Sequence, residues 1–388
     1  MKRLFSLLFV LAALCTPALA DDDVQWQYID AQDLRIINKG WDNTLRPYTR
    51  IPAFLEDSVR PTLWERSQCS SGIAVRFATN ARHIGVRYEL LWNTHLIHMA
   101  DTGLKGTDLY ILEADSVWRH VNTNRPYIKD KDTNPDSHWV ESTYVDGFDG
   151  QMHEFMIYFP LYDGVNQLFV KTEEGAEITA GNPRVIDRDR RIVAYGTSIL
   201  QGGCASRTGM CGTNIISREL NSEVVNVGIS GEGKMDFCMA RAMAQIADVD
   251  LYLIDPVPNC TEMMCDTLTY DFVKILADAH PNTPIVMLEG PIYPYARYDS
   301  FFGAYLPKKN AAFRRNFDRL VAEGYRNIYY IESTGLDGVE DDGTVDGIHL
   351  TDLGFRHYAN KMIPVLRPLL YPRNDMRSNT EIMHGEKK

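Results

Sequence analysis

Hydrophobic and polar positions follow two different rhythms along the 388-residue chain. In residues 21–185 the apolar segments are short, often alternate with polar residues, and are separated by Gly, Asn and Asp turns. A period of two places apolar side chains on one face of a strand. The segments are GIAVRFAT, HIGVRYEL, TDLYILEA, HEFMIYFP and NQLFVKT, and they predict an antiparallel β-sandwich.

From Arg190 onward, compact apolar strands alternate with helical segments. The expected strands are RIVAYG, EVVNVGI, DLYLIDP, PIVMLEG and NIYYIES, and the expected helices span 234–246, 267–279, 305–323 and 353–369. Strands that are apolar on both faces are typical of a parallel sheet covered by helices on each side. The second half is therefore predicted to be α/β.

The length of the chain favours two domains, since one domain usually takes about 100–200 residues. The polar run GNPRVIDRDR marks the boundary, so we predict a sandwich domain over 21–186 and an α/β domain over 187–372. Residues 373–388 form a polar tail without periodicity.

Residues 1–20 have a basic start, an apolar middle and a small-residue end, which is the pattern of a cleaved signal peptide. The protein is therefore expected in the periplasm or outside the cell. A lipid anchor on Cys15 is disfavoured, because Leu14 is bulkier than the small residue that such processing prefers.

Net charge and composition exclude some classes of binding partner. A net charge of −12 argues against nucleic acid or anionic lipid, and no later segment approaches the roughly 18 apolar residues of a membrane span. Six cysteines follow the signal, and disulfides are plausible in an exported chain. Cys204 with Cys211 and Cys260 with Cys265 could pair, but the connectivity and the oligomeric state stay open.

Ser198 follows the first strand of the second half, where the sequence reads RIVAYGTSILQGG. In an open parallel sheet, ligands bind beyond the carboxyl ends of the strands. Thr197 or Ser198 could simply cap the next helix. Alternatively, Ser198 is a nucleophile.

His349 and Asp346 lie three residues apart after the last expected strand, on the same sheet edge as Ser198. A serine hydroxyl needs a base to remove its proton, and a carboxylate that orients the base improves it. Ser198, His349 and Asp346 supply these three parts. Gly231 and Asn259 follow two other strands and could donate hydrogen bonds to an oxyanion, although each is also an ordinary turn residue.

Four segments, GTSILQGG, NVGISGEG, DPVPNC and DGIHLTDLG, together resemble the ordered blocks of the SGNH, or GDSL-type, hydrolases. The resemblance implies a flavodoxin-like three-layer α/β/α fold, Ser198 as nucleophile, His349 as base and Asp346 as its orienting acid. It also implies Ser198 (through its N–H), Gly231 and Asn259 as oxyanion donors, and no metal or organic cofactor. Thr197 replaces the common Asp of the first block, and the third block lacks the usual G-x-N-D form.

The segment GTDLYIL at residues 106–112 resembles the G-x-D-L-Y signature of a domain that precedes the catalytic domain in some bacterial SGNH esterases. That resemblance implies a jelly-roll-like β-sandwich and the deacetylation of carbohydrates. The expected substrate is an O-acetylated poly- or oligosaccharide such as xylan. Two other functions stay open, a lipase or thioesterase with the same triad and a non-catalytic carbohydrate-binding protein.

Three further features each have a functional and an ordinary structural explanation. His95 and His98 could share a metal at helical spacing, but the segment around them reads as strand and loop. Glu289 could line the active-site rim or end a strand in solvent. Tryptophans more often fill a sandwich core than bind sugar, though one could stack on a pyranose, and the candidates are Trp41, Trp64 and Trp92.

Overall fold

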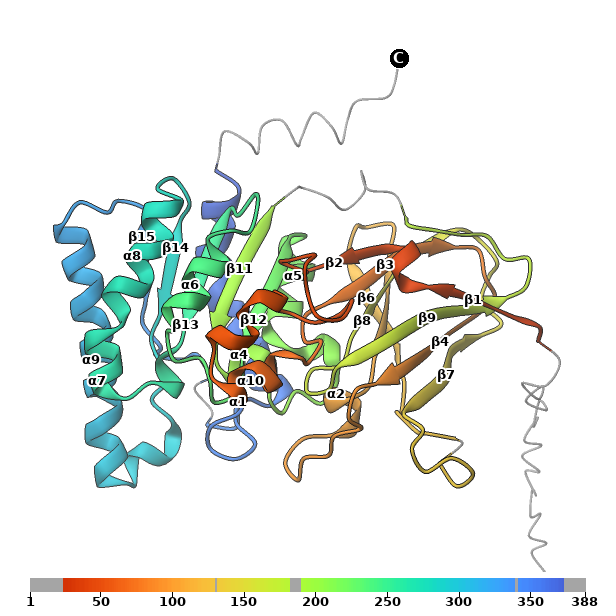
Figure 1. Ribbon diagram of the computed structural model, residues 1–388, viewed down its shortest axis with the longest axis horizontal. Helices are drawn as coiled ribbons and strands as arrows, with labels where there is room; N and C mark the ends of the chain where they lie inside the picture. The colour runs from red at the N-terminus through yellow and green to blue at the C-terminus, as the bar shows by residue number, and fades with distance from the viewer. Residues whose placement is uncertain (1–23, 130, 182–189, 339–340, 373–388) are drawn as a thin grey trace, which may run out of the picture.

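The computed structural model describes residues 24–129, 131–181, 190–338 and 341–372 (Figure 1). The predicted signal peptide at 1–20, the polar tail at 373–388 and most of the boundary run GNPRVIDRDR lie outside these residues. Two halves lie side by side in Figure 1, with the parallel sheet on the left and the antiparallel sheets on the right.

Two antiparallel sheets form most of the first half. One sheet has the order β1-β9-β4-β7, and the other has the order β10-β3-β8-β5-β6 with β2 paired to β3. The strands are β1 (Trp26–Asp30), β2 (Arg35–Ile37), β3 (Ala74–Thr79), β4 (His83–Leu90), β5 (Asp108–Leu112), β6 (Trp118–Thr123), β7 (Trp139–Asp146), β8 (His153–Tyr158), β9 (Val165–Glu173) and β10 (Ile178–Thr179).

The inner faces of the two sheets share one apolar core. Along β4, Ile84, Val86, Tyr88 and Leu90 alternate into this core, where they pack with Phe77 and other residues of the facing sheet. The prediction of an antiparallel sandwich is confirmed, including all five strands that alternation indicated. Strands with little burial, such as β6, were not expected because they lack a clear apolar face.

The second half contains a five-stranded parallel sheet with the order β12-β11-β13-β14-β15. Its strands are β11 (Arg191–Gly196), β12 (Glu223–Gly228), β13 (Leu251–Asp255), β14 (Ile285–Leu288) and β15 (Ile328–Ile331), which confirms each expected strand. Numbered along the sheet as 2-1-3-4-5, this is the flavodoxin-like order, as the resemblance implied.

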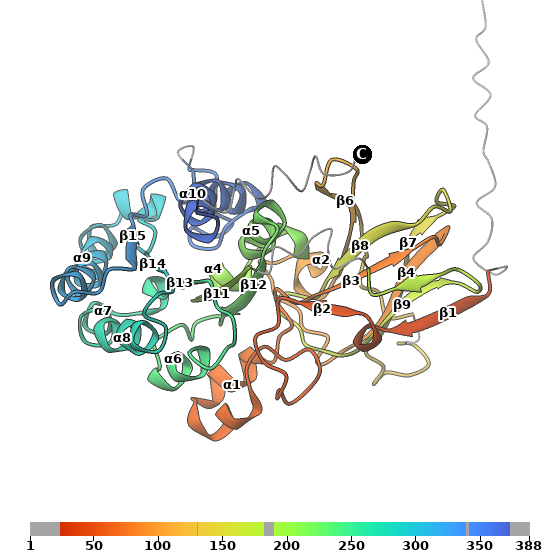
Figure 2. The same cartoon turned by 90° about the horizontal axis from the view of Figure 1, so that it is seen from above.

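Helices cover both faces of the parallel sheet, so the half has three layers (Figure 2). Helices α5 (Gly212–Leu220) and α10 (Asp352–Leu370) pack on one face, and α6 (Phe237–Met243), α8 (Thr269–Ala279) and α9 (Ser300–Ala322) pack on the other. Along β11, Ile192 and Ala194 face the first layer while Val193 and Tyr195 face the second. Alternate residues are thus buried on opposite faces, which explains the continuous apolar run.

The expected helices are confirmed with shifted ends. Helix α6 is shorter than predicted, and α9 begins earlier and continues through Pro307. Helix α5 was not expected, because Thr213, Asn214 and Ser217 make its buried face partly polar. Shorter elements are α1 (Pro61–Ser67), α2 (Asp101–Leu104), α4 (Ser198–Gln201), α7 (Glu262–Thr267), η2 (Ala31–Asp33), η3 (Ala53–Ser58), η4 (Thr208–Met210), η5 (Val257–Asn259) and η6 (Pro294–Arg297).

Among the described helices, none combines the length and the hydrophobicity that crossing a bilayer requires.

A segment of the first half packs within the core of the second. Trp41, Ile51, Leu55 and Leu63 are buried in the same cluster as Val193 and the helices α6, α8 and α9. The expectation that the tryptophans fill the sandwich core is therefore wrong for Trp41. The two halves share a core here, so neither is an independent packing unit.

The G-x-D-L-Y segment joins the two halves through a buried ion pair. Asp108 is fully buried, and its Oδ2 accepts hydrogen bonds from Arg207 Nη1 and from the Gly209 N–H, each at 2.7 Å. Arg207 Nη1 also donates to Tyr110 OH at 2.7 Å. A Cβ at Gly209 would lie 2.3 Å from the Tyr110 hydroxyl, so this approach requires glycine. We call Asp108, Tyr110 and Arg207 the clasp.

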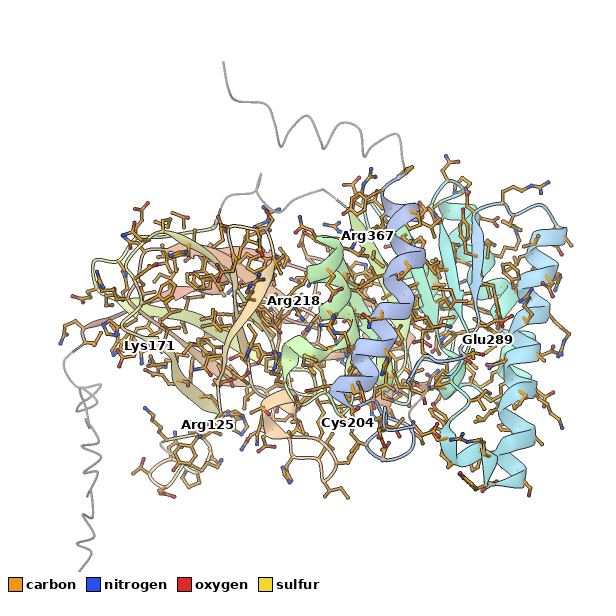
Figure 3. The ribbon with its side chains drawn as sticks, turned by 180° about the vertical axis from the view of Figure 1, so that it is seen from behind. Arg125, Lys171, Cys204, Arg218, Glu289 and Arg367 are labelled. Atoms are coloured by element: carbon orange, nitrogen blue, oxygen red, sulfur yellow. The ribbon has the colours of Figure 1, made fainter. Side chains whose placement is uncertain are left out.

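Arg218 of α5 reinforces the same junction. Its guanidinium carbon lies 4.2 Å from the centre of the Tyr110 ring and 5.4 Å from that of Tyr158, and both rings belong to the sandwich. Figure 3 shows Arg218 where the two halves meet. Cation–π contacts of this kind add to the attraction between the halves.

Replacement of Asp108 by Asn tests the clasp. The change leaves the Arg207 guanidinium without its counter-charge, and we expect a loss of about 3 kcal/mol in the free energy of unfolding. Urea unfolding measures this loss. Asp115→Asn is the matched control, because the Asp115–Arg119 pair is half exposed and such pairs contribute less than about 1 kcal/mol. Equal stability of the two variants would refute a stabilising clasp.

Asp255, at the end of β13, carries a buried carboxyl group. Its Oδ2 accepts one long hydrogen bond, from Tyr358 OH at 3.3 Å, and its Oδ1 has no partner among the described residues. Burial raises the pKa of Asp255 well above its ordinary value. The folded state therefore favours the protonated carboxyl, and this contribution to stability is lost as pH rises above the unfolded pKa.

Replacement of Asp255 by Asn removes this titration. We expect the stability of the wild type to fall relative to the variant as pH rises from about 5 to about 8, by at most about 1.4 kcal/mol per pH unit. Chemical denaturation of both proteins at several pH values provides the measurement. Parallel stability profiles for the two proteins would contradict a raised pKa.

Candidate active site

Ser198 lies at the carboxyl end of β11, between β12 and β13, where the strand order of the sheet reverses. Thr197 caps helix α4, because its Oγ1 accepts a hydrogen bond from the Ile199 N–H at 3.3 Å. The sequence left open whether Thr197 or Ser198 caps this helix, and the structure shows that Thr197 does. The hydroxyl of Ser198, which is buried, is available to another partner.

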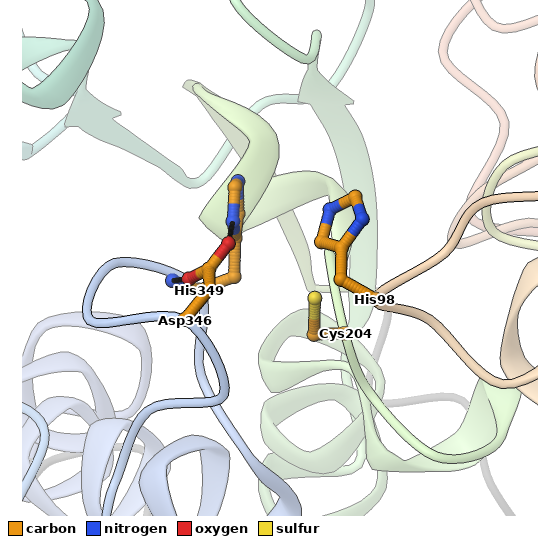
Figure 4. Close-up of side chains that lie close together, drawn as sticks. All are labelled: His98, Cys204, Asp346 and His349. Carbon is orange, nitrogen blue, oxygen red and sulfur yellow. Dashed lines mark hydrogen bonds and ion pairs between the residues drawn. The ribbon is translucent and has the colours of Figure 1, made fainter.

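That partner is His349. Its Nε2 lies 2.9 Å from Ser198 Oγ, and its Nδ1 lies 2.7 Å from Asp346 Oδ2. Figure 4 shows the imidazole of His349 beside the Asp346 carboxylate, with their interaction as a dashed line. In this geometry His349 can accept the hydroxyl proton while Asp346 holds the Nδ1–H tautomer.

Asp346 is oriented by its own loop. Its Oδ1 accepts the N–H groups of Ile348 at 3.0 Å and His349 at 2.8 Å. Partial burial raises the pKa of Asp346, but the hydrogen bonds from the His349 N–H, the His349 ring and the Ile348 N–H outweigh it and hold the pKa below its ordinary value. The carboxylate therefore stays charged opposite the imidazole.

The three predicted oxyanion donors follow three adjacent strands, so they lie at one sheet edge. Ser198 follows β11, Gly231 follows β12 with a φ of +70°, and Asn259 follows β13. Asn259 Oδ1 accepts the Gly233 N–H at 3.2 Å, which leaves its Nδ2 as a donor. Within the described part of the chain, no acceptor engages this Nδ2 or the N–H of Ser198 or Gly231.

A cavity of about 320 Å³ opens beside His349 and has walls from both halves of the chain. Arg66 forms part of the wall, and its Nη1 donates to the Ser230 carbonyl at 2.7 Å, next to Gly231. The lining includes Glu65, Arg66, Trp92, Thr94, His98 and Ser230. The wall also contains Leu96 and Tyr162, so polar, aromatic and aliphatic side chains surround the cavity.

A larger cavity, of about 630 Å³, lies between the sandwich and α5. Arg191, Glu223 and Asp250 line it, and they stand at the amino ends of the parallel strands. It is therefore at the sheet edge opposite Ser198. Size alone would have indicated the wrong edge.

Two residues that the sequence did not single out position the site. Tyr162 of the first half donates its hydroxyl to the Ser198 carbonyl at 3.2 Å. Gln201 Oε1 accepts the Ser230 N–H at 2.8 Å, so it holds the loop that carries Gly231. Gln201 lies inside the GTSILQGG block and could have been considered, whereas nothing near Tyr162 indicated a role.

The structure also locates the two histidines and the glutamate that the sequence analysis considered. His95 bonds Asp101 at 3.1 Å on the surface, whereas the ring centre of His98 lies 5.5 Å from that of His349, so they do not act as a pair. Glu289 accepts hydrogen bonds from Tyr330 OH and the Ser333 N–H. It therefore anchors the segment after β15 and is half-buried.

The tryptophans and cysteines that the sequence analysis considered lie in different environments. Trp64 packs against the core of the second half, and Trp92, which is 38% exposed, lines the cavity. All six described cysteines are free thiols, so the structure supplies no disulfide among them. Cys204 lies on the loop directly after α4, close to His349.

Comparison with known proteins identifies two families along the chain. Residues 189–367 match the GDSL-like Lipase/Acylhydrolase family, and residues 26–178 match the GxDLY family, described as the N-terminus of SGNH-hydrolase-type esterases. No curated protein matches the chain.

Several solved structures share the whole architecture. A protein from Bacteroides ovatus, described as a GDSL-like lipase, has 29% identity and a TM-score of 0.82, with 89% of this chain and 98% of that chain covered. A family two carbohydrate esterase from Cellvibrio japonicus has 14% identity and a TM-score of 0.53, with coverages of 89% and 98%. The acetyl xylan esterase Est2A from Butyrivibrio proteoclasticus has 11% identity and a TM-score of 0.54, with coverages of 88% and 98%.

Matches to both family models together span most of the described chain, and the fold and strand order agree with them. The chain belongs to the GDSL-like, SGNH-type ester hydrolases, and its first half is the GxDLY-type domain of these esterases.

Proposed function

We propose that the protein is an exported serine esterase that removes O-acetyl groups from carbohydrates. Ser198 Oγ attacks the ester carbonyl as His349 takes its proton. The N–H groups of Ser198 and Gly231 and the Asn259 amide stabilise the oxyanion, and His349 then protonates the departing sugar oxygen. Water, activated by His349, attacks the acetyl-serine and releases acetate.

This proposal rests mainly on the hydrogen-bonded series of Ser198 Oγ, His349 and Asp346, which we call the relay. Its two contacts measure 2.9 and 2.7 Å. Both distances lie within the reach needed for general base catalysis. The relay also stands at the strand-order reversal of the sheet, where α/β enzymes bind their ligands.

The mixed lining of the cavity is consistent with a sugar ester. Glu65, Arg66 and Ser230 offer groups that can hydrogen-bond sugar hydroxyls, and Trp92 offers a ring on which a pyranose can stack. Two of the similar folds are those of a carbohydrate esterase and an acetyl xylan esterase, which is consistent with an acetylated polysaccharide substrate.

We also propose that the protein is exported and that it has two domains. The pattern of residues 1–20 supports a cleaved signal, and the composition change supports domains over 21–186 and 187–372. A polymeric substrate outside the cell fits both.

Replacement of Ser198 by Ala tests the nucleophile. We expect esterase activity to fall by about 10⁴-fold or more and labelling by a fluorophosphonate probe to disappear, because the probe needs an activated serine. Intact-protein mass spectrometry measures the labelling. Ser300→Ala is the control, since Ser300 is an exposed residue at the start of α9 and should leave both readouts unchanged.

Labelling that survives Ser198→Ala would defeat the triad, and a wild type that is never labelled would favour a non-catalytic carbohydrate-binding protein. Acetate release from acetylated glycans, compared with p-nitrophenyl esters of increasing chain length, tests the substrate. We expect acetyl esters to react fastest. Faster reaction of butyryl and longer esters would favour the lipase or thioesterase function.

Two substitutions at Asn259 separate catalysis from structure. Asn259→Asp keeps an oxygen that can accept the Gly233 N–H, whereas Asn259→Ala removes it, and both remove the Nδ2 donor. If the donor binds the oxyanion, kcat falls by about 10²- to 10³-fold in both variants. If Asn259 only positions the Gly233 loop, the Asp variant will keep most of its activity. Steady-state kinetics with an acetyl ester distinguishes the two outcomes.

A further inference from the structure

His98, Cys204, Asp346 and His349 form a cluster that the esterase mechanism uses only in part. His98 comes from the loop between β4 and α2, Cys204 follows α4, and the other two precede α10. One nitrogen, sulfur or oxygen atom from each residue lies within 4.8 Å of the corresponding atoms of the others. Figure 4 shows the Cys204 thiol and the His98 ring on the side of His349 away from Asp346.

Two members of the cluster have donor atoms without a protein partner. Among the described residues, the ring nitrogens of His98 and the sulfur of Cys204 make no hydrogen bond. Cys204 is nearly buried, at 6% exposure, whereas His98 lines the cavity beside His349. An incoming ligand can therefore reach the cluster from the cavity without breaking other contacts of these two side chains.

Two imidazoles, one thiol and one carboxylate are the ligand types that Zn²⁺ prefers in proteins. Tetrahedral zinc, with Zn–N near 2.0 Å and Zn–S near 2.3 Å, holds such ligand atoms about 3.3–3.5 Å apart. The atoms of the cluster, which lie within 4.8 Å of one another, must therefore move closer by at most about 1.5 Å to bind one ion. Hard cations such as Mg²⁺ would avoid the thiol and the imidazoles.

We propose that His98, Cys204 and His349 form a binding site for Zn²⁺ and similar soft divalent cations, and that occupation of this site switches the esterase off. The Cys204 thiol proton passes to solvent as the sulfur binds the metal. His349 gives the metal the lone pair that would otherwise accept the Ser198 proton. Asp346 keeps its hydrogen bond to the His349 ring, and the two negative charges balance the cation.

Cobalt absorption tests the site directly. Co²⁺ added to the metal-free full-length protein should produce a thiolate-to-cobalt charge-transfer band in the near ultraviolet, with one ion bound per chain. Cys204→Ser should abolish the band, and His98→Ala should weaken cobalt binding by at least about tenfold. Cys238→Ser is the matched control, because Cys238 is a partly exposed thiol beside Ser58. It should leave the band unchanged.

Zinc inhibition provides the second readout. Zn²⁺ should inhibit the wild type and the Cys238→Ser variant equally and reversibly on addition of a chelator. Cys204→Ser should keep the basal activity, since Cys204 forms no hydrogen bond with Ser198, His349 or Asp346, while its half-inhibiting zinc concentration rises at least about tenfold. Circular dichroism of each variant checks that it is folded.

Absence of the cobalt band, a band that persists in folded Cys204→Ser, or equal zinc inhibition of both proteins would overturn the proposal. The inhibition depends on the proposed esterase function, but the cobalt band does not. Failure of Ser198 labelling with an intact cobalt band would refute only the esterase mechanism. Intact labelling without a band would refute only the metal site.

Discussion

Close packing of three strand ends is the constraint on which the rest of the structure depends. A Cβ at Gly228 would lie 2.5 Å from the Gln201 nitrogen, and one at Gly233 would lie 2.3 Å from the Gly196 carbonyl oxygen. Both distances are shorter than any tolerable contact, so glycine is required at each position. A Cβ at Gly196 would likewise lie 2.7 Å from the carbonyl oxygen of Asp255, at the end of β13. This packing brings the turn that bears Ser198 against the ends of β12 and β13. The proposed oxyanion donors and the proposed nucleophile therefore share one small region.

The first half takes part in the site and is more than an appended module. The clasp holds Arg207, which lies only three residues beyond Cys204, against the sandwich. Tyr162 supports the Ser198 carbonyl, and Trp92 and His98 form part of the cavity wall. Separation of the halves would thus open the cavity and release the loop after α4. The G-x-D-L-Y signature has a physical reason, because Asp108 and Tyr110 join the segment after α4 to a rigid sheet.

The strands could be predicted from the sequence, because the pattern of apolar residues along a strand shows whether one or both faces of its sheet are buried. The five parallel strands are apolar throughout because helices cover both sides, and β4 alternates because only one side is buried. The same reasoning failed for α5, whose buried face includes Asn214, and for Trp41, which packs in the other half. Those outcomes depend on partners that are distant in the sequence.

For the candidate site, the sequence by itself determined which groups stand at strand ends, because a parallel sheet brings the carboxyl ends of its strands to one edge. Ser198, Asn259, Asp346 and His349 were all identifiable in this way. Only the tertiary structure decided that Thr197 caps α4, that Gln201 and Tyr162 brace the turn, and that His98 and Cys204 approach His349. These contacts join segments separated by many residues, and local pattern carries no information about side chains that meet only when distant loops pack together.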